Sequence, residues 1–145
     1  DFINNMNISL DDLTYTTDNG YIKGISNIFV KHLQDMPPTE RPFHCSDTKR
    51  MQFYVKDEDK WEKDNQHEKI DSSISNIQYK QIRKIKNWEQ EHPNYLKDES
   101  LLQLWHDMIH QIMGPSDDAS REKNKEIIKK NIGTKVELKD AMIPI

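Results

Sequence analysis

The apolar residues of this chain change their spacing twice along its length, and that change limits the folds that the chain can adopt. Between Tyr21 and Met36 they recur every three or four residues, which is typical of one helix face, and Pro37 ends the pattern. Over residues 42–63 they alternate with polar residues, and from residue 68 the helical spacing returns. We therefore predict an α+β fold, predominantly α-helical, with four to five helices packed around a small antiparallel β-hairpin or meander.

Local signals set the limits of the other helices. Ser9 and Asp12 form a capping box at the start of a first helix, which ends at Gly20. Further helices are predicted over 68–91, 98–113 and 119–131, and Gly133 ends the last of them.

Two of these helices bear on the predicted core. The apolar stripe over 68–91 has a five-residue step after Ile77, which indicates either a kink or two helices joined near Gln78. The helix over 98–113 is the most apolar one, so we expect it at the centre of the core. The predicted core consists of Ile22, Ile25, Phe29, Leu33, Phe53, Val55, Ile74, Ile77, Leu101, Trp105, Ile109 and Ile112.

Length and composition exclude several classes of protein. The 145 residues have the length of one domain, and we expect a flexible N-terminal tether over 1–8, a single globular domain over 9–133 and a C-terminal tail over 134–145. Apolar runs are too short for a membrane-spanning helix or a signal peptide, and the one cysteine excludes an internal disulfide framework. The net charge of −4 provides no general attraction to nucleic acid or to an anionic membrane.

Two histidine-containing motifs are candidates for chemistry. His106 and His110 lie four residues apart on a predicted helix and can share a metal ion, but no third ligand follows at a recognisable spacing. They are therefore weak metal candidates, and local hydrogen bonding is the favoured interpretation. His44 and Cys45 are neighbours on a predicted strand and point to opposite faces, which favours a buried structural thiol over an activated nucleophile. We predict no catalytic residue, no metal and no cofactor.

Two surfaces are candidates for binding a macromolecule. The last helix has few apolar residues and the tail ends in an apolar patch, which indicates a surface for a partner formed by Ile127, Ile128, Ile132, Met142, Ile143 and Ile145. A stretch without acids between Asp71 and Glu89 forms a basic stripe of Lys80, Arg83, Lys84 and Lys86, with Tyr79 beside it. This basic stripe can contact phosphates, and a solvated helix face is the competing interpretation.

The segment RPFHCSDTKR at 41–50 carries the most specific pattern of the chain. Together with FYVKD at 53–57 and KWEKD at 60–64, it resembles an uncharacterised domain of mimivirus-like giant DNA viruses, whose members often show R-P-x-H-C-[ST]-D-x-K-R. The resemblance extends from Tyr21 to Gly114. In that family the domain usually lies toward the C-terminus of proteins with N-terminal zinc-finger or coiled-coil regions, and no catalytic residues are assigned.

We accordingly predict a non-enzymatic protein-interaction or self-assembly module, the folded end-domain of a larger scaffold-type viral protein. The resemblance implies that this protein acts in the host cell cytoplasm, in the viral factory. The expected partner is a second copy or another viral protein, with no membrane and no small-molecule substrate. A nucleic-acid-binding module that uses the basic stripe at 80–86 is the alternative.

Overall fold

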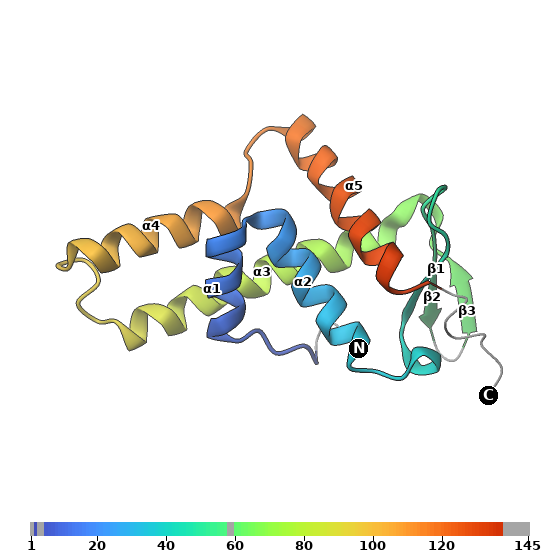
Figure 1. The fold of residues 1–145 in the computed structure, drawn as a ribbon, viewed down its shortest axis with the longest axis horizontal. Helices are drawn as coiled ribbons and strands as arrows, with labels where there is room; N and C mark the ends of the chain where they lie inside the picture. Colours follow the sequence, from blue (N-terminus) through green and yellow to red (C-terminus); the bar gives the residue numbers. More distant parts are fainter. Residues whose placement is uncertain (1, 3–4, 58–59, 138–145) are drawn as a thin grey trace.

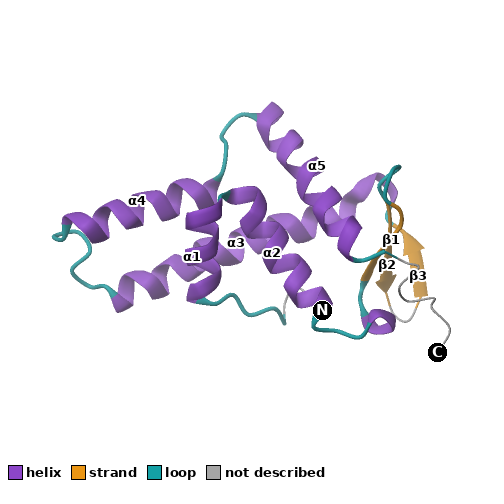
Figure 2. Ribbon diagram, viewed as in Figure 1, coloured by secondary structure: helices purple, strands orange, loops and turns teal. Residues whose placement is uncertain are grey.

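The structure is a computed structural model, and it describes residues 2, 5–57 and 60–137. The helices in this part of the chain are α1 (Leu10–Asn19), α2 (Tyr21–Gln34), α3 (Glu68–Glu91), α4 (Glu99–Met113) and α5 (Asp118–Lys135). The strands are β1 (Phe43–Asp47), β2 (Gln52–Asp57) and β3 (Lys60–Lys63). The sheet lies at one end of the molecule, and α3 and α4 extend toward the other end (Figures 1 and 2). The predicted α+β, mostly helical fold is confirmed.

The first two helices begin where the sequence indicated, and α2 ends at Gln34, two residues before the predicted end at Met36. The Ser9 hydroxyl accepts from the Asp12 backbone N–H at 3.1 Å, and the Asp12 carboxylate accepts from the Ser9 N–H at 3.0 Å. Gly20 separates α1 from α2 with a φ of 97°, a conformation that glycine adopts without strain. Arg41 then satisfies the end of α2, because its Nε donates to the Leu33 carbonyl at 2.9 Å.

The three strands form an antiparallel meander in the order β1-β2-β3, which confirms the prediction for 42–63. Phe43 pairs with Val55, and Cys45 pairs with Phe53, so these side chains share the face that packs against the helices. At the other edge of β1, the Cys45 N–H donates to the Val136 carbonyl at 2.9 Å. The chain that leaves α5 is thereby joined to the sheet.

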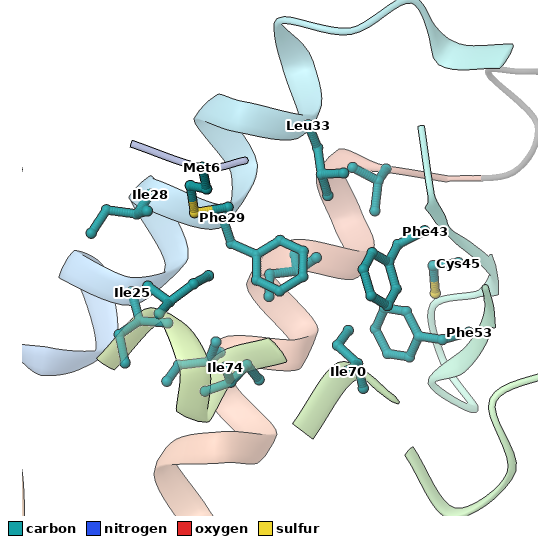
Figure 3. Packing of buried hydrophobic residues seen from close by; sticks show 14 of the residues in the cluster. Met6, Ile25, Ile28, Phe29, Leu33, Phe43, Cys45, Phe53, Ile70 and Ile74 are labelled. Atoms are coloured by element: carbon teal, nitrogen blue, oxygen red, sulfur yellow. The ribbon is translucent and has the colours of Figure 1, made fainter. Parts of the chain in front are cut away.

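The main core lies between the sheet, α2, α5 and the first half of α3. Figure 3 shows Phe29, Phe43 and Phe53 pointing toward one another there, and the Phe29 and Phe43 ring centroids are 5.4 Å apart. Ile128 and Ile132 of α5 are fully buried in the same cluster. The core therefore joins segments from both ends of the chain.

A second, smaller cluster holds α4 against α1 and the end of α3. Its buried members are Leu13, Ile85, Trp88, Met108 and Ile112. The prediction that α4 forms the centre of the core is therefore wrong, since α4 packs at the edge of the molecule. Five members of the predicted core are only partly buried, and they are Ile22, Val55, Leu101, Trp105 and Ile109.

Two predicted breaks in the helices are absent. α3 is one helix of 24 residues, because Gln81 occupies the position between Ile77 and Ile85 on its buried face and is itself fully buried. Gly133 does not end α5, which continues to Lys135. Gly133 instead allows close packing on the sheet, since a Cβ there would lie 3.2 Å from the Cys45 Sγ.

The end of the predicted tether and the beginning of the predicted tail lie inside the fold, so neither prediction is correct for these residues. Met6 and Ile8 are buried in the main core, and the Met6 carbonyl accepts from Lys80 Nζ at 2.8 Å. Val136 is also fully buried. The rest of the predicted tail, residues 138–145, lies outside the described residues.

Candidate functional site

The second half of α3 and the whole of α4 form an antiparallel helical pair, which we call the arm (residues 78–113). Trp105 Nε1 donates to the Glu89 carboxylate at 3.0 Å near the tip of the arm. At its base, Gln78 Nε2 donates to the Met113 carbonyl at 3.0 Å. These two contacts fix which flank of each helix is turned toward the other. The arm projects away from the sheet (Figure 1).

One side of the arm is covered by α1. Leu13 of α1 is buried in the same cluster as Met108 and Ile112, and Thr16 Oγ1 donates to Gln81 Oε1 at 2.7 Å. Helical spacing places a different set of residues on the opposite side. We call this side the outer face; it consists of Tyr79, Ile82, Arg83 and Lys86 of α3 and Leu102, His106, Ile109 and Met113 of α4.

Apolar side chains on the outer face are open to solvent. Tyr79 is 55% exposed and Met113 is 47% exposed, while Ile82 and Ile109 are partly buried between the helices. Burying such side chains is favourable by about 25 cal/mol per Å² of apolar surface removed from water. The outer face therefore combines an apolar seam with exposed apolar groups at its edge.

The charged side chains on the α3 side of the outer face, Arg83 and Lys86, are positive, while the exposed Glu99 lies on the same stripe of α4 as Leu102 and His106. Arg83 lies over the Tyr79 ring with its guanidinium carbon 4.5 Å from the ring centroid, a cation–π contact. Lys86 is exposed one turn further along α3. The nearest acid on α3 is Glu89, one turn beyond Lys86, and its carboxylate accepts hydrogen bonds from Trp105 Nε1 at 3.0 Å and from the Tyr95 hydroxyl at 3.2 Å.

The predicted basic stripe is divided between two sides of α3. Tyr79, Arg83 and Lys86 share the outer face, whereas Lys80 and Lys84 lie on another flank by helical spacing. Lys80 donates to the Met6 carbonyl and so anchors the N-terminal segment. The structure therefore brings together only part of the predicted set.

The predicted partner surface on α5 needs a correction. Ile128 and Ile132 are fully buried in the main core, because the apolar face of α5 already packs on α2 and the sheet. Ile127 is exposed, at 38%. Met142, Ile143 and Ile145 lie outside the described residues.

His106 and His110 are both exposed on α4. His106 contacts the ring of Trp105, with centroids 5.1 Å apart, and His110 borders a cavity of about 620 Å³ between α2, α4 and the start of α5. Among the described residues, no three His, Cys, Asp or Glu side chains gather closely enough to hold a metal ion.

His44 and Cys45 lie on opposite faces of β1, as the strand pattern predicts. The His44 Nε2–H donates to the Pro38 carbonyl at 2.8 Å, and burial lowers the pKa of His44 even though this hydrogen bond raises it. Cys45 faces α5, and burial raises the pKa of its thiol. The two side chains therefore do not form a nucleophile and its base.

A polar cluster around Lys129 was not predicted from the sequence. The Lys129 Nζ lies 2.9 Å from Glu126 Oε1 and 3.1 Å from Asp71 Oδ1, and it donates to His67 Nδ1 at 2.9 Å. His67 in turn donates from Nε2 to the Met51 carbonyl at 2.7 Å. Burial lowers the pKa of Lys129, but the two carboxylates outweigh it and raise that pKa.

This cluster binds α5 to α3 and to the turn before β2. Its amine stays charged at neutral pH, so Lys129 is an ion-pair partner and no nucleophile. The residues come from separate segments with no common spacing, and no sequence motif could have identified them. The cluster borders a cavity of about 450 Å³ beside Gln66, whose φ of 58° is left-handed.

Comparison of the chain with protein-family models, with curated proteins and with solved structures found no match. Among the described residues, none of the helices combines the length and the apolar character needed to cross a lipid bilayer.

Proposed function

We propose that this domain is a non-enzymatic protein-interaction module, and that the arm is its binding surface. One observation carries the proposal. Seven large apolar side chains are exposed among the described residues, and four of them, Tyr79, Leu96, Leu104 and Met113, lie on the arm. Tyr79 and Met113 border the outer face, Leu96 lies in the loop between α3 and α4, and Leu104 lies on α4. Exposed apolar side chains gathered in one region are typical of a protein-binding surface.

The composition of the outer face supports a protein partner. Its centre is the apolar seam of Ile82 and Ile109, and its edge carries Tyr79, Arg83 and Met113. Protein interfaces are enriched in tyrosine, methionine and arginine, and they surround an apolar centre with a polar rim.

Selection from a displayed library of random peptides tests this function. We expect the domain to enrich peptides that no longer bind the Tyr79→Ser/Met113→Ser variant. A matched control, Tyr15→Ser/Ile127→Ser, removes an exposed tyrosine and an exposed aliphatic residue elsewhere, and it should bind like the unmodified domain. Circular dichroism establishes that each variant is folded. Equal binding by the two variants, or failure to enrich any peptide, would refute the proposal.

A second candidate function is nucleic-acid binding, and the Arg83–Tyr79 pair with the nearby Lys86 favours it. Exposed aromatic rings and basic side chains are the groups that bind single strands. Retardation of a labelled oligonucleotide should then fall steeply as salt is raised and should disappear in Arg83→Glu. Retardation that Arg83→Glu leaves unchanged would remove this candidate.

A further inference from the structure

We propose that the outer face of the arm binds an acidic amphipathic helix of a partner protein. This inference rests on the proposed function and specifies the chemistry of the partner. It is carried by three features of the outer face, namely its shape, its apolar seam and the sign of its charges.

The shape of the outer face suits a helix. Two antiparallel helices leave a shallow seam between them, into which a third helix packs as in a bundle. From Leu102 to Met113 the exposed stripe of α4 extends over about 17 Å, at about 1.5 Å per residue. This length corresponds to about three turns of a bound helix.

The apolar seam requires a partner with one apolar face. Ile82 and Ile109 line the seam, and Met113 and Tyr79 border it. Phosphate groups gain no binding free energy from contact with an apolar seam. Apolar side chains such as leucine, spaced three and four residues apart on a helix, are buried favourably against it. The seam therefore favours a helix over a nucleic-acid strand.

The charges of the outer face require acidic flanks on that helix. Arg83 and Lys86 stand along the α3 edge, between the Gln78–Met113 contact at the base of the arm and the Glu89–Trp105 contact near its tip, whereas Glu99 lies at the start of α4, beyond that second contact. A second copy of this chain packed with α3 over α3 would bring Arg83 and Lys86 against the same residues of the partner, which opposes that symmetric dimer. Glutamates beside the apolar stripe of a partner would instead meet these cations.

The test uses synthetic peptides that bind to the full chain. One labelled helical peptide carries leucine every three or four residues with glutamate at the flanking positions, and a second peptide has lysine in place of every glutamate. Fluorescence anisotropy should show binding of the glutamate peptide and affinity at least about tenfold weaker for the lysine peptide. Raising the salt concentration should weaken the binding of the glutamate peptide.

A pair of neighbouring charge reversals locates the site. Arg83→Glu should weaken binding of the glutamate peptide by about tenfold or more, since it removes an attractive charge and adds a repulsive one. Lys84→Glu changes the net charge equally but lies on another flank, so we expect less than about a twofold change. Similar losses in both variants would show that only the net charge matters and would overturn the inference.

The remaining outcomes separate this inference from the proposed function. Equal binding of the two peptides that is lost in Met113→Ser would leave the arm as a protein-binding surface and overturn the acidic helix. If neither synthetic peptide binds but peptides from the library still require the arm for binding, the arm also remains a protein-binding surface and the acidic helix is overturned. An oligonucleotide that binds through Arg83 while neither peptide binds would overturn the inference in favour of nucleic acid.

Discussion

Gly24 and Thr16 lie where α2 crosses α1, and no other residue type fits at the glycine. A Cβ atom on Gly24 would overlap the Thr16 side chain, including its Cβ. That side chain is fully buried, and its hydroxyl hydrogen-bonds to Gln81, so it cannot move aside without breaking a contact. The crossing therefore depends on a single missing methyl group.

We predict that Gly24→Ala lowers the free energy of unfolding by about 1–3 kcal/mol, the cost of overfilling a packed site. Lys23→Ala, at the exposed neighbouring position of the same helix, should change it by less than about 0.5 kcal/mol. Urea unfolding of both variants measures the difference. Equal stability of the two variants would contradict the described crossing.

The buried His44 predicts a dependence of stability on pH. Burial lowers its pKa below the unfolded value of about 6.5, so the stability that it contributes is complete above that pH. As the pH falls from 7 toward 5, the unfolded chain takes up a proton at His44 that the folded chain resists, and the free energy of unfolding decreases.

The variant His44→Gln tests this prediction, because an amide can still donate to the Pro38 carbonyl but does not titrate. Urea unfolding at pH 7 and pH 5 should show a smaller loss of stability in the variant, by about 1 kcal/mol. An identical loss in both proteins would mean that His44 takes up its proton equally in the folded and unfolded chains, and would contradict the prediction.

At the scale of elements, local patterns predicted most of the helices and strands, because caps, glycines and apolar spacing are properties of neighbouring residues. The capping box at Ser9 and the alternation in β1 and β2 are examples. The interpretation of α3 was wrong because Gln81 is a polar residue at a buried position. The buried Gln81 side chain accepts a hydrogen bond from Thr16, which is 65 residues away in the chain.

We predict that Gln81→Met leaves α3 intact and maintains or raises the free energy of unfolding by up to about 1 kcal/mol. Gln81 Nε2 has no hydrogen-bond partner among the described residues, and Thr16 can donate to the Asp12 carbonyl at 3.1 Å instead. Gln78→Met removes the donor to α4 and should lower the stability by about 1 kcal/mol. If Gln81→Met proved the more damaging change, the amide would have a structural role.

At the scale of the whole molecule, the sequence could not show how the helices share the core. α4 has the strongest apolar stripe, yet its neighbours bury only part of it, while the weakly apolar α5 is held by Ile128, Ile132 and the Lys129 cluster. The sequence analysis placed the protein-binding surface on the last helix and the tail, and it singled out residues of the arm only as a basic stripe for nucleic acid and as a weak metal-binding pair. Arg83 and His106 lie on one face only because of the way in which α3 pairs with α4, which their separate positions in the sequence do not show.

The division into two clusters predicts unequal local stability. Among the described residues, five buried apolar side chains form the cluster that holds the arm and fifteen form the main core, so α4 should open more often than α2. Hydrogen exchange should therefore be faster at the central amides of α4 than at those of α2. Equal protection of the two helices would show that the molecule unfolds only as one unit.

The most direct test of the central claim is to locate binding on the folded domain. We would titrate the ¹⁵N-labelled chain with the glutamate peptide and follow backbone amide shifts. We expect shifts concentrated at residues 79–90 of α3 and 102–113 of α4, with the amides of α5 around Ile127 unchanged. Shifts centred on α5 or on the sheet, with the arm unaffected, would contradict the claim that the arm is the interaction surface.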